Sequence, residues 1–152
     1  MIQIRDGLPN DCERIATFQE AMAQATEDKR LDAEVLRAGV RAALVDPGRG
    51  LYLVAERGED VAGSLLVTHE WSDWRNGWFW WIQSVWVEPQ HRGHGVYRAL
   101  HEAVRARARA AGDVVGIRLY VERDNGGAQR TYAALGMTQT AYRLFEESLQ
   151  SP

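Results

Sequence analysis

The 152-residue chain has a single cysteine, Cys12, and no long apolar run. One thiol excludes an intramolecular disulfide, leaves a zinc site without its usual ligands, and suits a reducing compartment. No stretch approaches the length that a membrane span needs. Residues 1–5 also lack the apolar core of a signal peptide. We therefore expect a cytoplasmic protein that has no membrane partner.

The chain also lacks a strong excess of either charge, internal repeats and low-complexity segments. The net charge is −3, so nothing favours nucleic acid as a partner. Hydrophobic residues make up 45% and charged residues 26%, which is a globular composition. Because nothing marks a linker, we expect residues 1–152 to form one domain.

Hydrophobic periodicity and turn residues predict an alternation of strands and helices. Helices are expected to begin near Asn10 and Asp32 and to cover residues 96–111 and 127–135. Strands are expected at residues 2–5, 51–56, 61–70, 78–87, 114–121 and 140–145. Residues 57–60 read as a hairpin turn, and residues 71–77 as a polar, aromatic loop. This order predicts a mixed sheet with helices on both faces.

The most informative segment is the glycine-spaced basic loop at residues 90–95, which lies between a predicted strand and a predicted helix. Glycines allow a ligand to approach the backbone closely, and the first helical amides point outward with partial positive charge. A phosphate or pyrophosphate group is the natural ligand of such a loop. The spacing fits neither a dinucleotide fingerprint, because Arg98 stands where a glycine is needed, nor a nucleotide P-loop. A turn that merely joins strand to helix is the remaining alternative.

Two motifs resemble those of the GNAT superfamily of acyl-CoA-dependent N-acyltransferases. The loop is similar to the family's Gln/Arg-x-x-Gly-x-Gly/Ala signature through Gln90, Gly93 and Gly95, and residues 85–89 are similar to the strand that precedes it. Further along the chain, the family's Asn-x-x-Ala-x-x-x-Tyr-x-x-x-Gly-Phe/Met pattern is matched by Asn125, Ala128, Tyr132, Gly136 and Met137. The resemblance implies an α/β (α+β) fold, with a mixed central sheet of six to seven strands flanked by about four helices.

The resemblance implies acetyl-CoA as the acyl donor. Backbone groups of Val85 and Val87 would hold the pantetheine arm, and the amides of residues 92–97 would hold the pyrophosphate. The residues implied in cofactor binding are Val85, Val87, Gln90, Arg92, Gly93, His94, Gly95, Val96, Tyr97, Asn125 and Ala128. Tyr97 departs from the small residue that many members carry at its position, so its ring is expected to narrow the groove or to reach the cofactor.

The four histidines lack the spacing of a zinc motif, and we expect no metal. His91 and His94 lie in the basic loop and are expected to face solvent or a cofactor phosphate. His101 is expected on the surface or flank of the following helix.

By the same resemblance, Tyr132 is the candidate general acid that protonates the departing thiolate. A phenol titrates near pH ~10, so it keeps its proton at neutral pH and can donate it. The alternative for Tyr132 is an ordinary core tyrosine on a short helix.

The general base is less defined. Gln83 and Ser84 stand about where some polyamine-acetylating relatives place acidic residues, and neither accepts a proton from an ammonium at useful rates. That difference counts against a copied polyamine mechanism. Glu70 and Asp73 are candidates for the base, and His69 and Glu122 are further ones. Ordinary solvated side chains are the alternative for each.

All six tryptophans fall within residues 71–86. Those of the predicted strand at 78–87 are explained by core packing. Trp71 and Trp74, beside Asp73 in the predicted loop, form a candidate aromatic wall for a cationic amine, and Gln83 is a further candidate acceptor contact. A loop folded onto the sheet or a dimer contact is the equal alternative.

The sequence thus predicts an acetyl-CoA-dependent N-acetyltransferase that acts on a primary amine of a small molecule. Acetylation of a protein or peptide amine, and a non-catalytic acyl-CoA sensor, remain as alternatives. A homodimer is implied by the resemblance.

Overall fold

The computed structural model describes residues 1–150. They fall into two compact units, the first being Met1–Tyr120 and the second beginning at Val121. Each unit is described by itself below.

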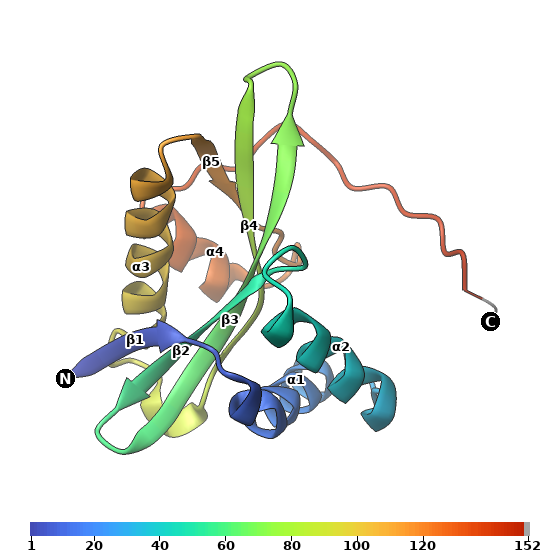
Figure 1. Cartoon of the computed structure of the whole chain (residues 1–152), viewed down its shortest axis with the longest axis vertical. Helices are drawn as coiled ribbons and strands as arrows, with labels where there is room; N and C mark the ends of the chain where they lie inside the picture. Colours follow the sequence, from blue (N-terminus) through green and yellow to red (C-terminus); the bar gives the residue numbers. More distant parts are fainter. Residues whose placement is uncertain (151–152) are drawn as a thin grey trace. The chain divides into compact units, whose positions relative to one another are not determined.

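The first unit is built on one five-stranded mixed sheet in the order β1-β2-β3-β4-β5 (Figure 1). The strands are β1 (Ile2–Asp6), β2 (Leu51–Arg57), β3 (Asp60–Ser72), β4 (Gly77–Val87) and β5 (Val114–Arg118). Neighbouring strands run antiparallel except for β4 and β5, which are parallel. The mixed α/β class is confirmed, but the described sheet has five strands instead of the expected six to seven.

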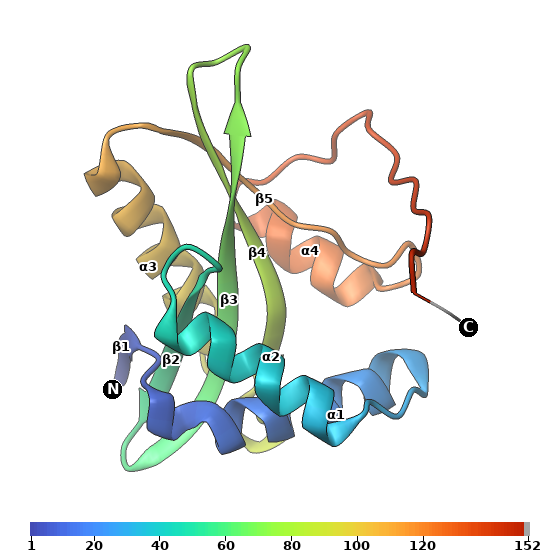
Figure 2. The same cartoon turned by 45° about the vertical axis from the view of Figure 1, so that its right-hand side comes forward.

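Helices cover both faces of this sheet, with α1 and α2 on one side and α3 on the other (Figure 2). Their bounds are α1 (Cys12–Glu27), α2 (Ala33–Val45) and α3 (Val96–Ala111). A short 3-10 turn, η1 (Pro9–Asp11), precedes α1, so this helix begins two residues after Asn10. Asp32 caps α2 as expected, because its carboxylate accepts bonds from the amides of Glu34 and Val35.

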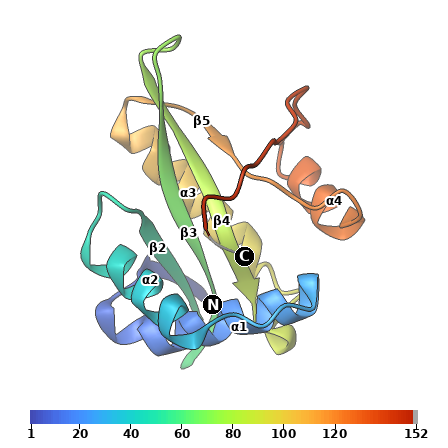
Figure 3. The same cartoon turned by 90° about the vertical axis from the view of Figure 1, so that its right-hand side faces the viewer.

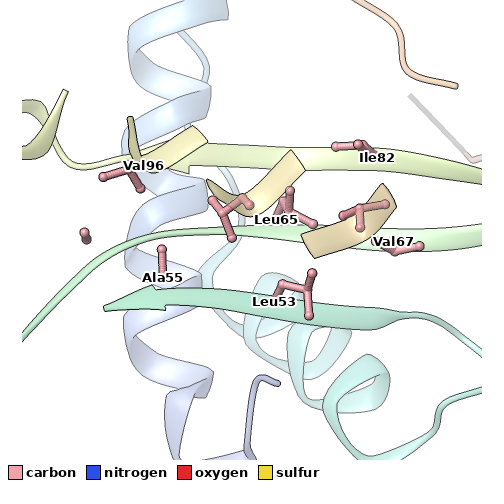
Figure 4. Packing of buried hydrophobic residues seen from close by; sticks show 9 residues of the cluster. Leu53, Ala55, Leu65, Val67, Ile82 and Val96 are labelled. Atoms are coloured by element: carbon pink, nitrogen blue, oxygen red, sulfur yellow. The ribbon is translucent and has the colours of Figure 1, made fainter. Parts of the chain in front are cut away.

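Alternation along β2 divides the core between the two faces. Tyr52 and Val54 pack with α1 and α2, whereas Leu53 and Ala55 pack with α3. Figure 4 shows the larger cluster, where β2, β3, β4 and α3 contribute buried apolar side chains. Helices α1 and α3 both contact β4, one from each side, which is why its sequence is mostly apolar on both faces.

Strands β3 and β4 form a long hairpin that extends beyond the helices of the first unit (Figure 1). β3 continues through Ser72 and β4 begins at Gly77, so the expected loop at 71–77 shrinks to residues 73–76. Trp71 therefore lies on a strand, where its ring meets the ring of Trp78 edge-on with the centroids 4.9 Å apart. This cross-strand aromatic pair accounts for the longer strands.

The described residues of the second unit, 121–150, contain one helix, α4 (Gly126–Ala134), visible in Figure 3. The side chain of Asn125 caps it by accepting a bond from the amide of Ala128 at 3.1 Å. The expected strand at 140–145 is wrong, because those residues form no strand and every residue from 138 to 150 is exposed. Phe145 is 93% exposed, so the alternating pattern here buries no apolar face. In the described part of the chain, no helix is both long and apolar enough to span a membrane.

Candidate active site

The basic loop leaves the N-terminus of α3 open. Gly93 and Gly95 have φ angles of 76° and 82°, in the left-handed region that glycine adopts without strain. Gly95 is the N-cap and supplies no side-chain cap, and the first amide that bonds back into the helix is that of Ala99, to the carbonyl of Gly95 at 3.0 Å. The amide of Val96 precedes that bond and points out of the helix terminus. This cradle of backbone donors fits a pyrophosphate.

Arg92 holds the loop against the end of β4. Its Nε donates to the carbonyl of Val87 at 2.9 Å, and its guanidinium lies 4.8 Å from the centroid of the Trp86 ring. Trp86 is fixed in turn by a bond from its indole nitrogen to Glu88 at 2.8 Å. These contacts use Nε and one face of the guanidinium, and they leave the terminal nitrogens of Arg92 for an anion.

Of the two histidines in the basic loop, His91 is placed differently from the expectation. His91 is buried, with its Nδ1 3.4 Å from Arg57 and its Nε2 3.4 Å from Asp60. It therefore packs the loop onto the β2–β3 hairpin and does not face solvent. His94 is exposed as expected, and its Nδ1 lies 2.9 Å from the carbonyl of Arg92. Gln90, in the short turn η2 (Pro89–His91), is also exposed.

His101 lies in the core of the first unit and not on the helix surface. It is only 1% exposed, and its Nδ1 shares a 3.0 Å hydrogen bond with the hydroxyl of Tyr97 one turn earlier. Burial lowers the pKa of His101, and the nearby Arg105 lowers it further. The Tyr97 ring packs against the core cluster, so the amide of Tyr97, and not its ring, is the group at the helix terminus.

The centre of β4 departs from regular strand geometry at Ser84. On one side Gln83 pairs with Leu66 and on the other Trp86 pairs with Ser64, so Ser84 and Val85 together oppose a single residue of β3. Such an extra residue is a β-bulge, and Ser84 has a φ of 54°, which is unusual for a residue with a side chain. The sequence carries no signal for this bulge.

The half of β4 that contains the bulge extends past the residues that pair with β5. Among the described residues, that ladder ends at the pair Trp81–Arg118. Val85 thus belongs to neither ladder, and backbone groups near it remain for an extended ligand arm. Val87 pairs with Gly63, and its carbonyl takes the bond from Arg92.

The candidate bases are each held by local contacts. The carboxylate of Glu70 accepts a bond from Arg118 at 2.9 Å, and the guanidinium of Arg118 lies 3.5 Å from the centre of the Phe79 ring. The carboxylate of Asp73 accepts the amide of Trp74 at 2.8 Å and so stabilises the hairpin turn. These contacts place both acids in the outer part of the long hairpin.

The candidate aromatic wall also lies in this outer part. Trp74 is 87% exposed at the tip, and Trp71 is 49% exposed opposite Trp78. Ser84 lies six positions after Trp78, which is about 20 Å along a strand. Gln83 is nearer to the bulge, and its amide donates to the hydroxyl of Thr68.

Tyr132 lies half-buried on α4 of the second unit. Burial raises the pKa of its phenol above the usual value, which keeps the proton on the oxygen at neutral pH. Asn125 uses its side-chain oxygen to cap the Ala128 amide, so its side-chain nitrogen is the group that remains for a ligand. Among residues 1–150, no group of three or more His, Cys, Asp or Glu side chains is arranged to hold a metal ion.

Comparison with known proteins agrees with this geometry. Residues 13–137 match the acetyltransferase (GNAT) family, and the chain belongs to that family. The protein is thus an acetyl-CoA-dependent N-acetyltransferase, because this family moves acetyl groups from acetyl-CoA to an acceptor.

Individual relatives support the same assignment. The chain is 38% identical to a "possible acetyltransferase" from Clostridium difficile 630, with a TM-score of 0.91 and 99% of each chain covered. It is 31% identical to a mycothiol acetyltransferase of Catenulispora acidiphila, covering 86% of this chain but 45% of the relative's length. The fold is also shared, at 16% identity and a TM-score of 0.78, with a "predicted acetyltransferase" from Clostridium acetobutylicum whose crystal structure contains acetyl-CoA; 97% of this chain and 96% of that chain are covered.

Proposed function

We propose that the protein acetylates a primary amine of a small molecule, and that acetyl-CoA binds along the α3 N-terminus and the inner half of β4. The observation that carries the proposal is the uncapped start of α3 beside a stretch of β4 that lies beyond the β5 ladder. Acetyl-CoA supplies the acetyl group as a thioester. Its pyrophosphate would accept bonds from the amides that follow Arg92 in the loop and from the terminal nitrogens of Arg92. The amide of Arg92 itself donates to the carbonyl of Pro89 at 3.3 Å.

The acyl end of the donor would lie against the bulge. An extended arm pairs well with free strand groups, so backbone groups of Val85 and Val87 are proposed to hold the pantetheine. A backbone amide at this point would also stabilise negative charge on the carbonyl oxygen. Gln90, His94, Asn125 and Ala128 are proposed as further contacts to the donor, Asn125 through its side-chain nitrogen.

Tyr132 is proposed as the general acid that returns a proton to the departing sulfur. The support is chemical: burial raises the pKa of the phenol, so the proton is present at physiological pH. The assignment also rests on the family pattern that begins at Asn125.

The acceptor is proposed to reach the thioester from the outer part of the β3–β4 hairpin. Trp71 and Trp74 offer aromatic surface to a cation, and Gln83 offers an amide nearer the bulge. Proton removal from the acceptor is proposed to proceed through water, with Glu70 or Asp73 as the base. The separation of about 20 Å between Trp78 and Ser84 favours an elongated acceptor, so a peptide amine is the second candidate.

An acceptor screen with acetyl-CoA tests this function. Polyamines, amino acids, aminoglycosides and peptides would be incubated with the enzyme, and release of free CoA thiol would be followed. Acceptor-dependent release with small amines supports the proposal, and sequence-dependent release with peptides alone supports the second candidate. Tight acetyl-CoA binding without turnover on any amine would instead indicate an acyl-CoA sensor.

We further propose that residues 1–152 act as one catalytic domain, since the family match runs across the division between Tyr120 and Val121. A cytoplasmic location is proposed from the single free, buried Cys12. A homodimer is proposed by family likeness, and light scattering of the purified chain tests it.

A further inference from the structure

Helix α1 sends one buried polar side chain to the centre of the sheet. Gln19 is 5% exposed, and its Nε2 donates to the carbonyl of Ser84 at 3.1 Å. A buried amide is costly unless it is hydrogen-bonded, and an apolar residue would fill the same space without that demand. The contact joins residues 65 positions apart in the chain, so no local pattern reveals it.

The partner of Gln19 is the strained residue of the β4 bulge. Ser84 has a φ of 54°, a conformation that a residue with a Cβ keeps only when its surroundings hold it. The ladder to β3 does not hold it, since the paired residues are Gln83 before the bulge and Trp86 after it.

The strand on either side of the bulge is fixed independently. Gln83 is tied to Thr68, and the indole of Trp86 is tied to Glu88. The backbone of the bulge is therefore the part of β4 that can change conformation. The bond from Gln19 restrains it through the carbonyl of Ser84.

We propose that Gln19 is a positioning residue that holds Ser84 in the left-handed conformation and so keeps the Val85 backbone available to the acyl arm of acetyl-CoA. This inference rests on the proposed donor site. Without the bond, Ser84 relaxes toward ordinary strand angles and the orientation of the Val85 amide changes. The α3 terminus has its own anchors in Arg92 and His91, so the pyrophosphate cradle keeps its shape.

The test compares two ligands in titration calorimetry. Acetyl-CoA contacts both the cradle and the bulge, whereas 3′-phosphoadenosine 5′-diphosphate, which lacks the pantetheine arm, contacts the cradle alone. In Gln19→Leu we expect acetyl-CoA affinity to fall about tenfold, while affinity for the nucleotide changes less than twofold. Gln19→Glu keeps the size of the side chain but loses the donor. We expect it to lose affinity for acetyl-CoA in the same way, with little change in affinity for the nucleotide.

A second substitution separates positioning from folding. Glycine adopts a positive φ without strain, so Ser84→Gly in the Gln19→Leu background is expected to restore most of the acetyl-CoA affinity. Gln24→Leu is the matched control, because Gln24 is exposed on the same helix and its side chain donates to the nearby carboxylate of Asp28. It should bind both ligands as the wild type does.

Three results would overturn the role of Gln19: unchanged acetyl-CoA affinity in both Gln19 variants, an equal loss for both ligands, or no recovery with Ser84→Gly. Failure of the wild-type protein to bind acetyl-CoA is a different outcome. It would overturn the proposed donor site and this inference with it.

Discussion

Arg92 and Val87 are joined by a 2.9 Å hydrogen bond from the guanidinium Nε to the backbone carbonyl. This bond fastens the glycine loop to the end of the strand from which it leaves. It sets the start of α3 close to the β4 terminus, so that a ligand with a pyrophosphate and an extended arm can meet both. Arg92 therefore positions the loop in addition to supplying positive charge.

Arg92→Lys should weaken acetyl-CoA binding although it keeps the charge. Lysine has no guanidinium group, so it lacks both the Nε–H that donates the bond and the flat face that stacks on Trp86. We expect a loss of about 1 kcal/mol, or roughly fivefold in the dissociation constant, measured by calorimetry. Arg98→Ala is the control, because Arg98 is 65% exposed and pairs with Glu102. Equal affinity in wild type and Arg92→Lys would contradict the prediction.

Gly95→Ala should destabilise the protein through backbone strain. A Cβ there would meet no atom within 4 Å, so the cost comes from the φ of 82° and not from a clash. We expect about 1 kcal/mol in chemical unfolding, together with weaker acetyl-CoA binding.

Gly39→Ala is the matched substitution with the opposite expected sign. Gly39 lies exposed inside α2, and its Cβ would also meet nothing within 4 Å. Alanine there should stabilise the protein by roughly 0.5–1 kcal/mol. A stabilising effect at both positions would contradict the assigned strain at Gly95.

Tyr132→Phe should lower kcat by about 100-fold with little change in the acetyl-CoA KM, if Tyr132 is the general acid. The acid works while protonated, and burial raises its pKa, so wild-type activity should persist through the pH at which an ordinary phenol titrates and fall only at higher pH. The variant should lack this alkaline fall. The pH profile of kcat with an identified acceptor checks both expectations, with Tyr142→Phe, at a 74% exposed tyrosine, as the control.

Asp11→Asn should destabilise the protein by about 2 kcal/mol at neutral pH. Burial alone would raise the pKa of Asp11, but bonds from Arg5 and from the Leu8 amide outweigh it and hold the pKa below its usual value. A carboxyl with a lowered folded pKa stabilises above its unfolded pKa of about 4, and that stabilisation is lost as pH falls through the folded pKa.

Unfolding by urea from pH 7 down to pH 2 checks this prediction. Asp11→Asn should remove part of the acid-dependent loss of stability that the wild type shows. Asp46→Asn, in an exposed pair with Arg49, is expected to change stability by less than about 1 kcal/mol. The assignment would be contradicted if the free energy of unfolding of Asp11→Asn fell as steeply with acid as that of the wild type.

Local spacing in the sequence determined several backbone features of this protein. The glycines at 93 and 95 take the positive φ angles that the loop needs, Asp32 caps α2, and the turn at residues 57–60 joins β2 to β3. Each of these features depends on the backbone preferences of residues a few positions apart, which is why the sequence alone predicts them.

Only the tertiary structure decided the features that depend on distant partners. The bulge at Ser84 needs β3 beside it, and its contact with Gln19 joins two layers of the fold. Burial of His101 depends on how α3 packs on the sheet. Conversely, residues 140–145 alternate as a strand does but have no sheet neighbour to complete their hydrogen bonds. Periodicity shows which residues can share a face, and the packing of the chain decides whether that face has a partner.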